Sequence, residues 1–336
     1  MMKRFLVSMF FVVALGATAH ATELETTLGY GTFPGAYPFT AQIALSNLAI
    51  LENPDLSLGF VLGTQRAGVA IGAGFDFGPL GRASTDTRFD VIFSGGVRFR
   101  TNLRGTLGPI ALELNGGFWT ASSFEANRFS MFERDPEPFS ANGFLVGANA
   151  QYRLSRNLTL KVGGRYVPES SRIFVGLESR MGEFTLSGGA LLAPQNLGLT
   201  YGATFGIKFV PEQAPYRLNA EIFLGGNPTG FTYGAVLDAS FDFLNQDDEK
   251  TASLSAFLAV EPWREDTNIA ILNSSGFITQ VPLRFGVSLE LNLGPGVLFS
   301  RGFGGLTFTG SQSGLAQLSY GFQLGYRINL ESLFGG

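Results

Sequence analysis

Apolar and polar side chains alternate along most of this chain, and the charged residues fall in the polar set. Within residues 232–243, for example, Leu237 and Phe241 belong to the apolar set, whereas Asp238 and Asp242 belong to the polar set. A period of two places successive side chains on opposite faces of a β-strand. The sequence therefore predicts strands that each have one apolar and one polar face.

The same alternation recurs in other segments, at 144–153, 158–166, 199–209 and 281–292. An Arg or Lys facing lipid at the bilayer midplane costs about 2–4 kcal/mol, so this separation favours a sheet whose apolar face meets lipid. Ile92 and Phe174 depart from the pattern, because they fall in the polar set. We expect them to be either apolar contacts inside the lumen or signs of a displaced register.

The first 21 residues have the order of a secretory signal peptide. Lys3 and Arg4 precede a short apolar run, and Ala19-His20-Ala21 forms an A-x-A cleavage site. The run is shorter than the roughly 20 apolar residues that a spanning helix needs. We therefore predict residues 1–21 to be a signal peptide and residues 22–336 to be a single domain.

The composition points to a membrane protein without spanning helices. Charged residues make up 15% of the chain, against about 25% in typical soluble domains. No later segment is long and apolar enough to be a membrane helix, yet the chain holds 33 Phe. Only helices and closed barrels satisfy every backbone polar group in lipid. The sequence thus predicts an all-β, antiparallel up-and-down barrel in contact with outer-membrane lipid.

Turn signals and connection lengths predict about 16 strands, within a range of 14 to 18, since barrels of this type have even strand numbers. Two connections, 121–141 and 262–280, are long, and long loops lie on the outer side. Counting backwards from the last strand to Phe39 leaves one stretch over. We expect that stretch, within 22–37, to be a periplasmic or lumenal segment, unless one strand has been counted twice.

The last strand carries a pattern that resembles the assembly signal of bacterial outer-membrane β-barrels. Its polar, Gly and hydrophobic positions are Gln323, Gly325, Ile328 and Leu330. The chain is similar to that superclass, and porin-like in strand number, rather than to one family. It departs from many members by continuing for six residues after Leu330. The resemblance implies the barrel-assembly machinery as a partner and leaves a homo-oligomer open.

Several kinds of chemistry are excluded by missing residue types. The chain has no Cys, and its only His, His20, leaves with the signal peptide. Catalysis in outer-membrane enzymes resembles Ser-His or Asp-His designs, which need imidazole as a base. The formal net charge of −4 argues against nucleic acid. We therefore expect no enzymatic activity, no cofactor and no metal site.

Charged residues of the polar set are the candidates for a pore lining. They are Arg98, Arg100, Glu113, Arg153, Lys161, Arg165, Arg217, Glu221, Asp238, Asp242, Arg284, Glu290 and Arg327. They either set ion preference or form salt bridges that stiffen the wall. Basic positions slightly outnumber acidic ones, which hints at a weak anion preference.

The connection 121–141 either folds inward as a constriction or lies on the surface. Its candidate constriction residues are Glu125, Arg128, Glu133, Arg134 and Asp135.

Three functions are consistent with these features. The leading hypothesis is an outer-membrane channel for passive diffusion of small hydrophilic solutes or ions. The alternative is a transporter of an apolar ligand with a plugged barrel, in which Ile92, Phe174, Phe223 and Phe257 form an apolar lumenal patch. A third is a structural or adhesive membrane protein whose outer loops bind a partner.

Overall fold

The structure is a computed structural model and consists almost entirely of β-strands. It describes residues 23–31, 39–52, 55–93, 95–120, 143–166, 171–195, 198–212, 214–228, 230–245, 249–260, 280–309 and 316–330. One short 3₁₀ helix, Gly78–Leu80, accompanies the strands. No helix among the described residues is long and apolar enough to cross a membrane.

Eighteen strands follow one another along the described chain. They are β1 (Glu23–Gly31), β2 (Phe39–Glu52), β3 (Asp55–Gly63), β4 (Arg66–Asp76), β5 (Gly81–Ile92), β6 (Val97–Leu107), β7 (Ile110–Trp119), β8 (Gly143–Arg153), β9 (Leu158–Tyr166), β10 (Arg172–Met181), β11 (Phe184–Gln195), β12 (Gly198–Phe209), β13 (Tyr216–Asn227), β14 (Gly230–Leu244), β15 (Lys250–Val260), β16 (Gln280–Leu293), β17 (Gly296–Thr309) and β18 (Ala316–Asn329).

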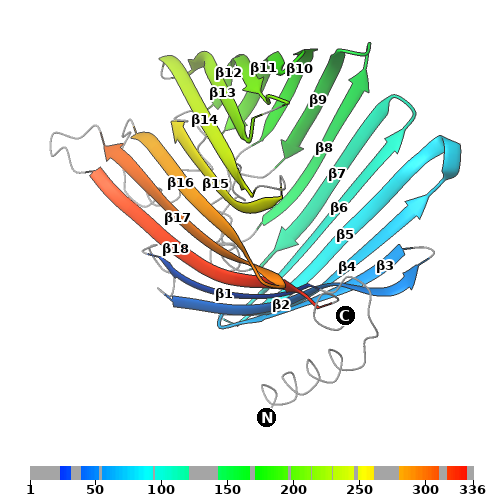
Figure 1. Cartoon of the computed structure of the whole chain (residues 1–336). Coiled ribbons are helices and arrows are strands. Elements are labelled where there is room, and N and C mark those ends of the chain that lie inside the picture. The colour runs from blue at the N-terminus through cyan, green and yellow to red at the C-terminus, as the bar shows by residue number, and fades with distance from the viewer. Residues whose placement is uncertain are drawn as a thin grey trace.

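The strands form one closed antiparallel ring (Figure 1). Each strand pairs with its neighbours in sequence, and β1 pairs with both β2 and β18. Leu28 of β1, for example, lies opposite Leu324 on one side and Ala41 on the other. The predicted all-β, up-and-down barrel is confirmed, with a strand number at the upper end of the expected range.

The N-terminal stretch that the strand count left over is a strand of the wall. Glu23–Gly31 forms β1, so the expectation of a periplasmic or lumenal segment is wrong for these residues. Seventeen strands follow from Phe39 onward, one more than the count had given. Without β1, the facing edges of β2 and β18 would present unpaired backbone groups, and lipid offers these no hydrogen-bond partner.

The two faces of the wall differ in chemistry as the alternation predicted. Large apolar side chains are exposed on the outer face, Leu237 at 51% and Tyr201 at 55% among them. The outer face also holds a pair of hydroxyls, since Thr87 and Thr101 lie opposite each other and are hydrogen-bonded at 3.0 Å. This mutual bond satisfies one polar group with the other, which lowers the cost of placing them in an apolar environment.

Connection lengths distinguish the two ends of the barrel. The long connections after β7 and β15 both leave from one end, which we call the loop end. Strand β1 begins and β18 finishes at the opposite end, the turn end, where β10 and β11 are joined by a turn around Gly182 with φ +61°. Short turns lie on the periplasmic side and longer loops outside in such barrels, so we expect the loop end to face the exterior.

Candidate functional site

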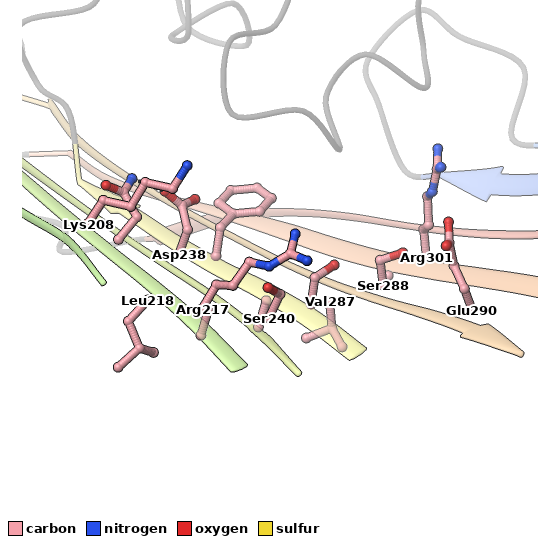
Figure 2. Close-up of a pocket in the computed structure, with 16 residues that line it drawn as sticks. Lys208, Arg217, Leu218, Asp238, Ser240, Val287, Ser288, Glu290 and Arg301 are labelled. Atoms are coloured by element: carbon pink, nitrogen blue, oxygen red, sulfur yellow. Dashed lines mark hydrogen bonds between the residues drawn. The ribbon is translucent and has the colours of Figure 1, made fainter. Parts of the chain in front are cut away.

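The predicted pore-lining residues lie on the face opposite the exposed apolar side chains, which is the lumenal face. Figure 2 shows this for β12 to β17. Asp238 and Arg301 project to one side of the sheet, and Leu218 and Val287 point to the other side. Residues that lie directly opposite each other on antiparallel strands point to the same face of the sheet. The strand register therefore assigns the lumenal residues of the other strands as well. Ile92, which is buried, and Phe174 are lumenal too, so the register inferred from sequence parity was correct.

One lumenal cavity of about 550 Å³ lies against β12 to β17. Arg217, Asp238 and Glu290, three of the predicted residues, line it together with Lys208 and Arg301. Three serine hydroxyls follow one another across the strands between these charges, at positions 240, 255 and 288. The mixture of signs makes this wall polar but close to neutral.

Hydrogen bonds tie the acids of this wall to neighbouring strands. Asp242 accepts from Lys250 Nζ at 2.9 Å and from Ser253 Oγ at 2.8 Å, and lies 3.7 Å from Arg217 Nη2. Asn219 Nδ2 donates to Asp238 at 2.8 Å. These partners hold the carboxylates in place, which is the wall-stiffening role that the sequence left as an alternative.

A second cavity, of about 380 Å³, lies against β5 to β10, and we call it the arginine cavity. Five arginines line it, namely Arg88, Arg98, Arg100, Arg165 and Arg172. Among the described residues that line it, Asp86 is the one acid. Arginines therefore outnumber acids in the described lining, in contrast to the wall across the lumen.

Asp90 organises the basic side chains next to this cavity. Its carboxylate is 1% exposed and lies 3.3 Å from Arg88 Nε, 3.5 Å from Arg66 Nη1 and 3.8 Å from Arg98 Nη1. Glycine 68 leaves room for it, because a Cβ there would come within 2.1 Å of Asp90 Oδ1. Three guanidinium groups thus share one buried carboxylate.

Other predicted residues form isolated ion pairs along the wall. Glu113 accepts from Arg104 Nε at 2.8 Å, Lys161 pairs with Glu178, and Arg327 Nε donates to Glu25 at 3.1 Å across the seam between β18 and β1. For these residues the pairing supports a stiffening role.

The remaining lumenal predictions differ in their surroundings. Arg284 is buried, Glu221 lies opposite Val236 of β14, and Arg153 donates to the carbonyl of Arg156 at 3.3 Å. The predicted constriction residues, 125 to 135, lie outside the described residues.

Burial varies along the lumen. Asp90, Thr200 and Phe223, toward the loop end, are each no more than 3% exposed. Toward the turn end, the side chains of Arg82 and Arg104 are 81% and 68% exposed. The arginine cavity lies in the loop-end half of the lumen.

The apolar residues of the lumenal face pack against glycines of adjacent strands. Phe174 lies opposite Gly163 and Phe257 opposite Gly286, and a Cβ on either glycine would come within 2.7 Å of the facing ring. Phe223 packs in the same manner over β12 and contacts Leu191 and Ala193 of β11. Rings that cover a neighbouring glycine restore contacts that the glycine lacks, so these rings serve as wall packing.

Sequence parity did not single out three lumenal basic residues, namely Arg66, Arg104 and Arg301. Arg88 alternates with Phe89 and Val91, which places it in the polar set with Ile92. Outward-facing threonines in the same strand, such as Thr87, weakened the contrast between the two sets.

No group of three or more His, Asp or Glu side chains within the described ranges is arranged to hold a metal ion.

Comparisons with known proteins agree with the architecture. No family model and no curated protein sequence matches the chain. Among solved structures, OccK10 (OpdN) of Pseudomonas aeruginosa has a TM-score of 0.54 at 9% identity, covering 92% of this chain and 98% of that chain. OccK11 (OpdR) of the same organism has a TM-score of 0.54 at 11% identity, with 92% and 95% covered. The chain therefore has the fold of a porin-like outer-membrane β-barrel.

Proposed function

We propose that this protein is a channel for the passive diffusion of small hydrophilic solutes and ions across the bacterial outer membrane. The observation that carries this proposal is the closed ring of eighteen strands with a polar, charged inner face that contains cavities. Barrels of 16 to 18 strands are wide enough to leave an aqueous channel. The exposed apolar outer face supports contact with lipid.

The alternative of a transporter for an apolar ligand has less support. The lumenal phenylalanines do not form one continuous surface: Phe174 lines the arginine cavity, whereas Phe257 lines the cavity across the lumen. Each is accounted for by packing over a glycine. An enzymatic role is disfavoured because the mature chain lacks His and Cys.

The barrel-assembly machinery is the expected partner during insertion. Strand β18 contains Gln323, Gly325 and Ile328, and Leu330 follows it directly. This strand pairs with β1 to close the ring, which supports a role for these residues in barrel closure.

Purified, folded protein is expected to produce stepwise conductance increases in planar lipid bilayers. The reason is that a polar lumen of this width admits hydrated ions. Heat-denatured protein from the same preparation serves as the control and is expected to give no steps. If folded protein, verified by its β-sheet circular dichroism, gives no steps either, the channel proposal is wrong.

Ion flow is expected to favour anions over cations. The described residues that line the arginine cavity include five arginines and one acid, Asp86. One charge at about 8 Å in water changes an ion's energy by about 0.5 kcal/mol, with opposite sign for chloride and potassium. Salt at about 0.1 M reduces each shift by roughly half over this distance. Arg100→Gln is therefore expected to lower the chloride-to-potassium permeability ratio about twofold, measured from reversal potentials in a KCl gradient.

The control for this measurement is Arg82→Gln. Arg82 lies near the turn end, and its side chain is 81% exposed. The permeability ratio of this variant is expected to match that of the unmodified protein. Equal ratios in all three proteins would show that the arginine cavity does not set ion preference.

A further inference from the structure

Three serine hydroxyls form a row across the wall on β12 to β17, and we call it the serine row. Ser240 of β14 lies directly opposite Ser255 of β15, which lies directly opposite Ser288 of β16. Directly opposite residues have Cβ atoms about 4.5–5.5 Å apart, so the hydroxyls follow one another at a regular interval. None of them is hydrogen-bonded to another described residue, which leaves each hydroxyl able to donate to and accept from a solute.

The neighbouring row of directly opposite residues contributes an aromatic ring. Phe257 of β15 lies opposite Asp238 of β14 and Gly286 of β16. A Cβ on Gly286 would lie within 3.1 Å of three atoms of the Phe257 ring, so the ring lies over the glycine and along the wall. Phe257 is half-buried, unlike Phe223 and Phe299 of the same lumenal face, which are 3% and 1% exposed. Packing on the glycine therefore leaves part of the ring open to the cavity that it lines.

Groups that donate and groups that accept hydrogen bonds surround the serine row. Arg217 of β13 and Arg301 of β17 stand at its two ends, each directly opposite a serine. Asp238 lies beside the ring and accepts a hydrogen bond from Asn219 at 2.8 Å. Figure 2 shows Asp238, Ser288 and Arg301 on the same side of the sheet. A solute hydroxyl both donates and accepts, so it can pair with each of these groups.

The geometry points to a binding site for a neutral cyclic sugar on this wall, with one face of the sugar against Phe257 and its hydroxyls on the serine row. This inference rests on the proposed channel function, because the site lies in the lumen through which solutes would pass. A cyclic sugar presents C–H groups on the face of its ring, which pack on an aromatic surface, and hydroxyls at its edge. Ligand sites combine aromatic side chains with a few polar groups that fix the orientation of the ligand.

The site lies near mid-height of the wall and is large enough for this ligand. Ser255 is in the middle of β15 and Ser288 is near the middle of β16, so a solute that crosses the lumen passes the serine row. The cavity volume of about 550 Å³ equals that of roughly eighteen water molecules at about 30 Å³ each. A hexose therefore fits with water around it.

Block of ion current by sugars tests the inference. Glucose, maltose and sorbitol are each titrated against the folded barrel in a planar bilayer at constant KCl. Sorbitol carries its hydroxyls on an open chain without a ring face, so it controls for hydroxyl binding and for the volume that a solute occupies. Glucose or maltose is expected to halve the current at concentrations about fivefold lower than sorbitol does. The more potent sugar identifies a monosaccharide or a disaccharide as the preferred ligand.

Substitutions on the wall localise the effect. Phe257→Leu keeps an apolar side chain over Gly286 but removes the flat ring face, and Ser255→Ala removes the central hydroxyl of the serine row. Each is expected to raise the half-blocking concentration of the more potent sugar about fivefold, and Ser255→Ala carries the test if Phe257→Leu does not fold. Ser84→Ala removes a lumenal hydroxyl of β5, in another cavity, and is expected to leave that concentration unchanged. Equal potency of both sugars and sorbitol, or equal block in all variants, would overturn the inference.

Binding can also be measured without conductance, so that this inference and the channel proposal fail separately. Calorimetric titration of the barrel with maltose, in a detergent without a sugar headgroup, is expected to give a saturable heat, and Ser255→Ala is expected to weaken binding about fivefold. A barrel that conducts but shows neither block nor saturable binding by either sugar contradicts the sugar site alone. A barrel that binds maltose saturably but never conducts contradicts the channel alone.

Discussion

Replacing Asp90 with alanine is expected to lower the free energy of unfolding by about 3–5 kcal/mol, because it leaves buried charges uncompensated. The carboxylate is buried beneath three arginines from β4, β5 and β6. Without it, the guanidinium groups of Arg66 and Arg98, whose side chains are 11% and 6% exposed, repel each other with little water to screen them. Urea unfolding in lipid vesicles, followed by tryptophan fluorescence, measures the change.

A matched substitution in a solvated pair separates this effect from charge removal in general. Glu113→Ala also removes a lumenal carboxylate, but the Arg104 side chain that it pairs with is 68% exposed. Exposed pairs contribute about 0–1 kcal/mol, so a small loss is expected. Similar losses in the two variants would mean that Asp90 is not a structural centre of the arginine wall.

A second substitution keeps the test informative if Asp90→Ala fails to fold. Adding Arg66→Leu to Asp90→Ala removes one of the two buried arginine charges that surround Asp90, the other being Arg98. The double variant is expected to be more stable than Asp90→Ala alone. No recovery would indicate that the loss comes from the missing side-chain volume rather than from charge repulsion.

Much of the barrel could be predicted because the lumen and the lipid impose opposite requirements on alternate residues. In β14, where Leu237 alternates with Asp238, the sequence alone assigned both faces. In β5 the assignment was weaker because the outward Thr87 looks polar in sequence, although it is satisfied by Thr101 on the next strand. A period-two pattern cannot reveal that hydrogen bond, which depends on the register between strands.

The arginine site could not be predicted for the same reason. Arg66, Asp90 and Arg98 lie in three strands, and they converge only because Asp90 is opposite Arg98 and diagonal to Arg66. Register depends on turn geometry and on which faces are buried, so parity alone places residues on a face without placing them next to one another. The sequence therefore indicated a charged lumen but neither the cavity nor the cluster of arginines around Asp90.

Gly325 belongs to the proposed assembly signal and lies in β18, the strand that pairs with β1 to close the barrel. It lies opposite Phe299 of β17 on one side and Thr27 of β1 on the other. Phe299 is 1% exposed, and its ring lies 5.1 Å from Arg301 Cζ and 5.6 Å from Arg327 Cζ, measured to the ring centroid. The ring therefore has little freedom to move away from the glycine.

Gly325→Ala is expected to destabilise the barrel by about 1–3 kcal/mol through overpacking and to reduce the fraction that closes. A Cβ at this position would lie 2.2 Å from Phe299 Cζ and 2.7 Å from the Thr26 carbonyl oxygen, so both the ring and the backbone of β1 would have to shift. The folded fraction is measured as the heat-modifiable band on electrophoresis without boiling, together with the urea midpoint.

Gly305→Ala in β17 is the matched control, because among the described residues its added Cβ would meet only the Leu283 carbonyl oxygen, at 3.8 Å. Its folded fraction is expected to equal that of the unmodified chain. Combining Gly325→Ala with Phe299→Leu is expected to restore part of the loss, since the ring clash is removed while the contact with β1 remains. Equal behaviour of Gly325→Ala and Gly305→Ala would show that the seam tolerates a side chain. The overpacking argument for this position would then be wrong.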